Sequence, residues 1–158
     1  MQIRDVLAGI AITGIVTGII DGLFSSLLSV AFYHSTVERL FQGVASVLVG
    51  SEALKGGTRT MLLGILMHFG VAFAWSIVFW VLVGQVDRIR NLLISPNGVL
   101  AISILYGPLI WMTMSLVVIP LLAQRPPITY RWWIQFFGHI LFVALPIVAC
   151  TRRFWPPG

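Results

Sequence analysis

Four long apolar runs limit the folds that this chain can adopt. They cover about residues 6–31, 59–84, 99–122 and 130–150, and each approaches or exceeds the roughly 20 residues that cross a bilayer core as a helix. Only 9% of the 158 residues are charged, whereas soluble domains are roughly one quarter charged. The sequence therefore predicts a single all-α transmembrane domain, a four-helix bundle in a lipid bilayer.

A shorter helix is expected between the first two runs, over about residues 36–49. Ser35 followed by Glu38 is a capping-box pattern, in which two side chains satisfy free backbone amides at the helix start. The segment is too short to span and mixes charged with apolar residues, which is typical of a helix at the membrane interface. Gly50 is expected to end it, because glycine readily adopts the left-handed conformation of a helix stop.

Three local features are expected further along the chain. Gly107-Pro108 should kink the third span, because proline lacks an amide hydrogen and clashes with the preceding turn. Trp80 is placed as part of an aromatic belt at the bilayer interface. Residues 85–91 are expected as a charged connection and residues 95–98 as a turn.

The first run carries a stripe of small residues. Gly14, Gly18 and Gly22 are four residues apart and therefore lie on one face of a helix. In the second run Gly64 and His68 begin a comparable small-and-polar stripe. Small residues let helices approach closely in lipid, where hydrophobicity alone does not drive association. We interpret these glycines as helix-packing positions, against the other stripe or against a partner outside the chain.

Ionisable and polar side chains fall at one depth. Asp21, His68 and His139 each lie roughly nine to eleven residues from the same membrane face, about 14–16 Å along a helix. Gln135 lies one turn before His139, and Tyr106 lies beside the expected proline kink. A carboxylate this deep costs on the order of 2.5–3.5 kcal/mol and normally has a partner. We predict an intramembrane polar cluster of these five side chains.

The chemistry of this cluster is open to three interpretations. Its hydrogen bonds could fix the register of the helices. It could handle protons or ions, because histidine titrates near neutral pH and intramembrane carboxylates often mark ion paths. His68 and His139 could instead ligate haem or a metal ion. Residues 35–58 are then either a plain connector or a cap that closes this layer.

Other classes of protein are disfavoured. The formal net charge of +5 comes without a basic stripe or aromatic platform for nucleic acid, and arginines near helix ends explain it as lipid headgroup contacts. The sequence contains no Gly-x-Ser-x-Gly, no His-Glu-x-x-His and no phosphate-binding loop, so we expect no enzymatic activity. The single cysteine, Cys150, excludes an internal disulfide.

The basic residues give no preferred orientation in the membrane. One side holds Arg4, Arg88, Arg90, Arg152 and Arg153, and the other holds Arg39, Lys55, Arg59, Arg125 and Arg131. The positive-inside rule therefore favours neither side. We place both termini in the cytoplasm, the commoner arrangement for an even number of spans.

Several short patterns together resemble a known family. They are Phe41 to Ser46, Gly56-Gly57, Gly64 with His68-Phe69, Tyr106-Gly107, Pro120-Leu121, Gly138-His139, Leu145 to Ile147, and Arg152-Arg153. From Phe41 onward the chain resembles a family of uncharacterised bacterial four-span inner-membrane proteins. The resemblance implies a bacterial inner-membrane location and four spans, and it implies no reaction, ligand or site residue.

The expected function is non-enzymatic. We expect a small structural or accessory subunit, without a cofactor, that packs with copies of itself or with a larger membrane complex. One alternative is a small proton-coupled transporter or channel that uses the polar cluster, and another is a haem- or metal-binding electron-transfer subunit. The spans around His68 and His139 also superpose as a weak internal repeat, an arrangement found in transporters.

Overall fold

The computed structural model describes residues 2–124 and 127–155. Its four long apolar helices are Ile3–Phe32, Gly57–Gln85, Pro96–Leu122 and Tyr130–Phe154, each long and apolar enough to cross a membrane. A short helix lies between the first two. The predicted fold class is confirmed, and the chain is a multi-span membrane protein. Arg125, counted above among the basic residues, lies outside the described residues.

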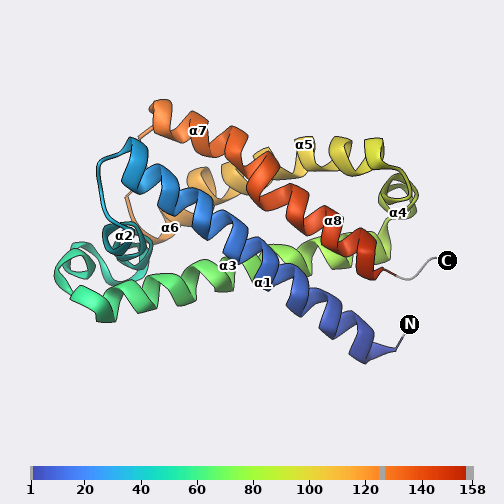
Figure 1. The fold of residues 1–158 in the computed structure, drawn as a ribbon, viewed down its shortest axis with the longest axis horizontal. Coiled ribbons are helices and arrows are strands. Elements are labelled where there is room, and N and C mark those ends of the chain that lie inside the picture. The colour runs from blue at the N-terminus through green and yellow to red at the C-terminus, as the bar shows by residue number, and fades with distance from the viewer. Residues whose placement is uncertain (1, 125–126, 156–158) are drawn as a thin grey trace.

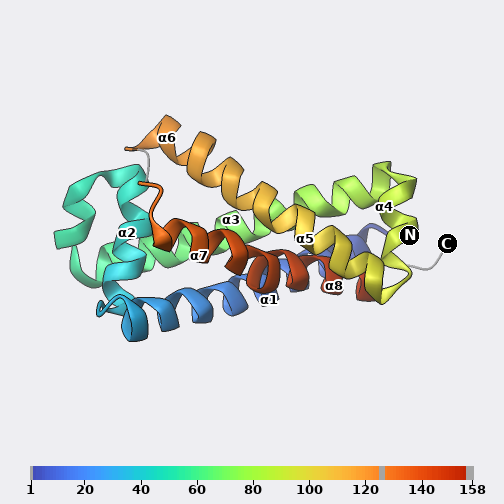
Figure 2. The ribbon, with the colours of Figure 1, turned by 90° about the horizontal axis from the view of Figure 1, so that it is seen from above.

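The four spans run side by side along the long axis of the molecule (Figure 1 and Figure 2). Helix α2 lies at one end, and both described chain ends lie towards the other, near α4. The elements in chain order are α1 (Ile3–Leu27), η1 (Leu28–Phe32), α2 (Val37–Val49), η2 (Ser51–Lys55), α3 (Gly57–Gln85), α4 (Asp87–Leu93), α5 (Pro96–Thr113), η3 (Met114–Val118), α6 (Ile119–Leu122), α7 (Tyr130–His139), η4 (Ile140–Ala144) and α8 (Leu145–Phe154).

Two of the three π-helical segments among the described residues precede a proline. Pro120 follows η3 and Pro146 follows η4, each by two residues. A proline clashes with the carbonyl four residues earlier, and the wider π turn contains that carbonyl in both spans. Helix α5, in contrast, continues through Pro108, so the irregular turn of the third span lies at η3 and not at Gly107-Pro108.

The hydrophobic core lies between the second half of α3, α5 and the end of the fourth span. Its fully buried members include Phe79, Ile110 and Ile147. Several buried hydroxyls bond to the carbonyl one turn earlier in their own helix, as Ser103 does to Val99 (2.8 Å) and Thr151 to Ile147 (2.7 Å). This pairing removes the cost of burying a hydroxyl where no bulk water reaches.

The predicted capping box of α2 is wrong by one residue. The N-cap is Thr36, whose hydroxyl oxygen accepts the amide hydrogen of Arg39 at 3.0 Å. Thr36 has the extended backbone that directly precedes the helix, so its side chain reaches the third helical amide. Glu38 instead accepts a hydrogen bond from the Gln42 side chain at 3.1 Å. The helix does end at Gly50, at φ 76°.

Two further local predictions are wrong. Trp80 does not lie in an interfacial belt: it is 3% exposed, and its indole nitrogen donates to the Thr13 hydroxyl at 3.4 Å. The second wrong prediction is the turn at residues 95–98: Ser95 caps α5 by accepting the amide hydrogen of Gly98 at 3.0 Å, and residues 96–98 form the first turn of that helix. The charged connection before it is present as expected, and most of it is helical, with Asp87 and Arg90 paired one turn apart along α4.

Candidate functional site

Spans one and two bring Asp21 and His68 together. Oδ2 of Asp21 lies 3.8 Å from Nδ1 of His68, and their side chains are only 17% and 13% exposed. The other ring nitrogen, Nε2, lies 2.9 Å from the carbonyl oxygen of Gly18 on α1. A carbonyl oxygen can only accept, so Nε2 is the nitrogen that donates a hydrogen. The imidazole therefore joins α3 to α1 by a hydrogen bond and faces the carboxylate with Nδ1.

This hydrogen bond decides what His68 presents to Asp21. In a neutral imidazole only one nitrogen carries hydrogen, so Nδ1 then presents a lone pair. An ionised carboxylate also only accepts hydrogen bonds. Neutral His68 and ionised Asp21 would thus place two acceptors opposite each other in a medium of low dielectric. One additional proton, on the carboxyl group or on Nδ1, makes the contact attractive.

The glycine stripe of α1 receives side chains of α3. A Cβ atom on Gly22 would lie 3.4 Å from Nε2 of His68, and one on Gly18 would lie 2.5 Å from the Phe69 ring. A Cβ on Gly14 would meet the ring of Phe73. The stripe therefore lies against rings of the second span. The absence of a side chain at Gly18 makes room for the Phe69 ring, and the His68 imidazole lies at van der Waals distance from the position that a Cβ on Gly22 would take.

Gly64 lies elsewhere, against α2. A Cβ atom on Gly64 would overlap the carbonyl oxygen of Phe41. The ring centroid of Phe41 lies 5.8 Å from that of His68, edge to face. Because α2 contacts both Gly64 and His68, this arrangement supports the interpretation of residues 35–58 as a cap and not as a plain connector.

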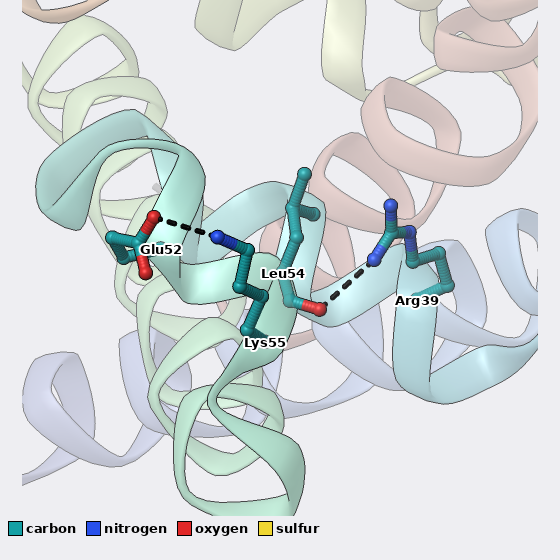
Figure 3. A network of polar contacts seen from close by, with 4 residues as sticks. All are labelled: Arg39, Glu52, Leu54 and Lys55. Carbon is teal, nitrogen blue, oxygen red and sulfur yellow. Dashed lines mark hydrogen bonds and ion pairs between the residues drawn. The ribbon is translucent and has the colours of Figure 1, made fainter.

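Polar contacts hold this cap in place. The Arg39 guanidinium donates to the carbonyl of Leu54 at 2.9 Å, and Lys55 pairs with Glu52 at 3.1 Å (Figure 3). The Gln42 amide donates to the carbonyl of Gly57 at 3.3 Å. The bonds of Arg39 and Gln42 connect α2 to the turn that enters α3, on the side of the molecule where the His68 site lies, and the pair of Lys55 with Glu52 lies within that turn.

Tyr33 and Arg131 connect the end of the first span to the start of the fourth at this membrane face. The Arg131 guanidinium lies 4.2 Å from the centre of the Tyr33 ring. Burial raises the pKa of the Tyr33 hydroxyl, the positive charge of Arg131 opposes this, and the neighbouring hydroxyl of Tyr130 adds to it.

His139 has different partners from His68. Its Nδ1 lies 2.7 Å from the carbonyl oxygen of Gln135, one turn earlier in α7, and therefore donates to its own helix. The ring of Trp111 lies against it, with 4.8 Å between centroids. The backbone of α5 also approaches closely, because a Cβ on Gly107 would lie 2.6 Å from the amide nitrogen of Ile140.

Asp21, His68 and His139 are within electrostatic range of one another. The structure thus places the three ionisable groups of the predicted cluster in one region. Gln135 contributes its backbone carbonyl, as described above. Tyr106 lies apart: its hydroxyl donates to the carbonyl of Trp75 at 2.8 Å, and its ring belongs to the hydrophobic core.

Two side chains near the cluster, Thr17 and Trp111, were not predicted as site residues from the sequence. Among the described residues, Oδ1 of Asp21, the hydroxyl of Thr17 and the indole nitrogen of Trp111 are buried without a hydrogen-bond partner. Thr17 lies one turn before Asp21, and Thr13 one turn before Thr17, so a polar line runs along the inner face of α1. Buried polar atoms without partners are expected to bind water, an ion or a proton.

In the part of the chain that the structure describes, no group of three or more histidine, cysteine, aspartate or glutamate side chains is arranged to hold a metal ion. Comparison with protein-family models, curated proteins and solved structures finds no match. The resemblance to a bacterial four-span family stays a prediction. The fold and the site define a multi-span membrane protein in which a carboxylate of one span meets a histidine of the next inside the helical bundle.

Proposed function

We propose that this chain is a non-enzymatic protein of the bacterial inner membrane that binds and releases a proton at Asp21 and His68, as a small proton-coupled transporter or channel. One observation carries the proposal: Nε2 of His68 donates to Gly18, so Nδ1 faces the Asp21 carboxylate at 3.8 Å. Such a pair is stable when it holds one proton between its two members and unfavourable when it holds none.

Two further features are consistent with proton movement. His139 lies within electrostatic range of Asp21, and its Nε2 carries a lone pair when the ring is neutral, because Nδ1 is the donor to Gln135. Thr17 and Thr13 continue the polar line from Asp21 towards the opposite membrane face. Intramembrane chains of aspartate and histidine are typical of proton relays.

A structural or accessory role, in an oligomer or a larger membrane complex, is the second candidate. The observation that favours it is the hydrogen bond from His68 to the Gly18 carbonyl, which joins two spans whether or not His68 is charged. We do not propose haem or metal ligation by His68 and His139.

Proton flux into liposomes tests the first candidate. The purified protein is reconstituted with an internal pH-sensitive dye, and a potassium diffusion potential drives proton entry. We expect flux above that of empty liposomes for the wild type and for Asp5→Asn, a control that neutralises an exposed carboxylate at the start of α1. We expect no flux for Asp21→Asn, because asparagine keeps the shape of aspartate and does not titrate.

Thermal stability in detergent separates the two candidates. Asp21→Asn that unfolds near the wild-type temperature yet carries no flux supports the proton role. Wild-type protein that carries no more flux than empty liposomes excludes that role. In that case a large loss of stability in Asp21→Asn would favour the structural candidate.

A further inference from the structure

A groove lies between the first turn of α5 and the last turns of α8, away from the Asp21 site. Its volume is about 350 Å³, and it is lined by Val99, Ala149, Arg152 and Arg153. Both helix ends lie at the end of the bundle where the chain termini are found (Figure 1 and Figure 2). Since these are ends of membrane-spanning helices, the groove lies at the level of the lipid headgroups.

One of the two arginines is held in place from across the groove. A terminal nitrogen of Arg152 donates to the carbonyl oxygen of Ile94 at 3.0 Å, which connects α8 to the residues just before α5. A guanidinium has five N–H donors, so this bond leaves others to bind an anion. Among the described lining residues none is acidic, so the groove itself supplies no carboxylate to neutralise the two guanidinium groups.

The remaining lining is apolar. Val99 is buried and Ala149 lies on the neighbouring turn of α8, so the groove combines two guanidinium groups with aliphatic walls. A phospholipid has two parts that complement this lining. Its phosphate matches the guanidinium groups, and its glycerol and first methylenes match the aliphatic walls. Arginine binds phosphate with paired hydrogen bonds, and basic pockets between transmembrane helices bind anionic headgroups.

We propose that this groove binds the phosphate of an anionic phospholipid through Arg152 and Arg153. The lipid would hold the start of the third span against the end of the fourth. The inference is independent of proton binding at Asp21, because none of the lining residues belongs to that site. Inorganic phosphate offers the same charge without the glycerol and acyl parts, so it distinguishes a lipid site from a simple anion site.

Native mass spectrometry of the protein in detergent, titrated with phosphatidylglycerol or phosphatidylcholine, tests the proposal. We expect tighter binding of phosphatidylglycerol, weakened about fivefold by Arg152→Gln and by Arg153→Gln, from the usual contribution of one arginine near anionic lipid. Arg153→Gln leaves the bond from Arg152 to Ile94 intact, so it reports binding even if Arg152→Gln loosens the helix ends. Arg88→Gln is the matched control, since it removes one charge outside the groove.

Three results would overturn the proposal. Equal affinity for the two lipids would show that the phosphatidylglycerol headgroup is not recognised. An equal loss of affinity in Arg88→Gln and Arg153→Gln would assign the effect to general surface charge. Inorganic phosphate or glycerol phosphate that competes as well as the lipid, mole for mole, would assign the groove to a free anion.

Discussion

His68 and His139 look alike in the sequence and differ in the structure. Each lies roughly ten residues inside an apolar span, and each has one ring nitrogen bonded to a backbone carbonyl. His68 donates to Gly18 on a different span, whereas His139 donates to Gln135 in its own helix. The first histidine therefore depends on how spans one and two sit against each other, and the second on the geometry of α7.

The side chains that surround the two histidines also differ. The His68 imidazole lies beside Gly22 of α1, and the Phe41 ring of the cap packs against it edge to face. His139 lies against the Trp111 ring, with the α5 backbone at Gly107 directly beside it. The hydrogen bond of His68 crosses between helices, so it depends on the relative position of spans one and two, whereas the bond of His139 lies within one helix and does not. We therefore expect His68, more than His139, to respond to movement of the spans.

Gly107→Ala should give the largest change, at the His139 side. The new Cβ would lie 2.6–2.7 Å from backbone atoms of His139 and Ile140, which cannot rotate away. We expect a loss of about 1–3 kcal/mol in the free energy of unfolding, as for other overpacked sites. Gly70→Ala is the control, because its Cβ meets nothing within 4 Å. Equal unfolding temperatures in detergent for the two variants would contradict the close contact of spans three and four.

A double-mutant cycle between Asp21→Asn and His68→Ala should give the next largest effect. We expect a coupling of about 0.5–1.7 kcal/mol, the range of interhelical polar contacts in membranes. The coupling should fall as pH rises and change sign once the pair loses its shared proton, because two acceptors then face each other. Chemical unfolding in detergent at several pH values measures this. A coupling that is zero at every pH would mean that the two groups do not interact.

The sequence predicts the spans and the depth of the cluster better than it predicts partners. Bilayer thickness fixes the length of a span, and a constant rise per residue converts sequence position into depth. The rotation of each helix about its axis is not fixed in this way, because one residue corresponds to about 100°. Tyr106 accordingly faces Trp75 and the core, although its position beside Pro108 placed it with the predicted cluster.

The sequence also did not predict contacts that depend on which other spans pack nearby. The glycine stripe of α1 was predicted to pack closely, but the side chains that fill it are the rings of His68, Phe69 and Phe73. Gly107 was interpreted through the proline that follows it, and its role as the contact point for His139 has no local signal. Thr17 had such a signal, since it lies one turn before Asp21 on the buried face.

Thr17→Val should give the smallest effect, and it tests the Asp21 side of the comparison. The two side chains have nearly the same shape, and the Thr17 hydroxyl is buried without a partner among the described residues. Removing an unpaired buried hydroxyl should leave the free energy of unfolding unchanged within about 0.5 kcal/mol, or raise it. Thr13→Val is the matched variant: it deprives the Trp80 indole of its acceptor and should cost about 1–3 kcal/mol.

The outcome at Thr17 also bears on how Asp21 exchanges its proton. If water joins the Thr17 hydroxyl to the unpaired oxygen of Asp21, Thr17→Val should lose stability like Thr13→Val, and it should also slow proton flux. If no water lies there, the valine variant should carry wild-type flux. In that case the proton of Asp21 must be exchanged through His68 and the cap next to it. The part of the molecule that moves during this exchange would then lie on the side of spans one and two.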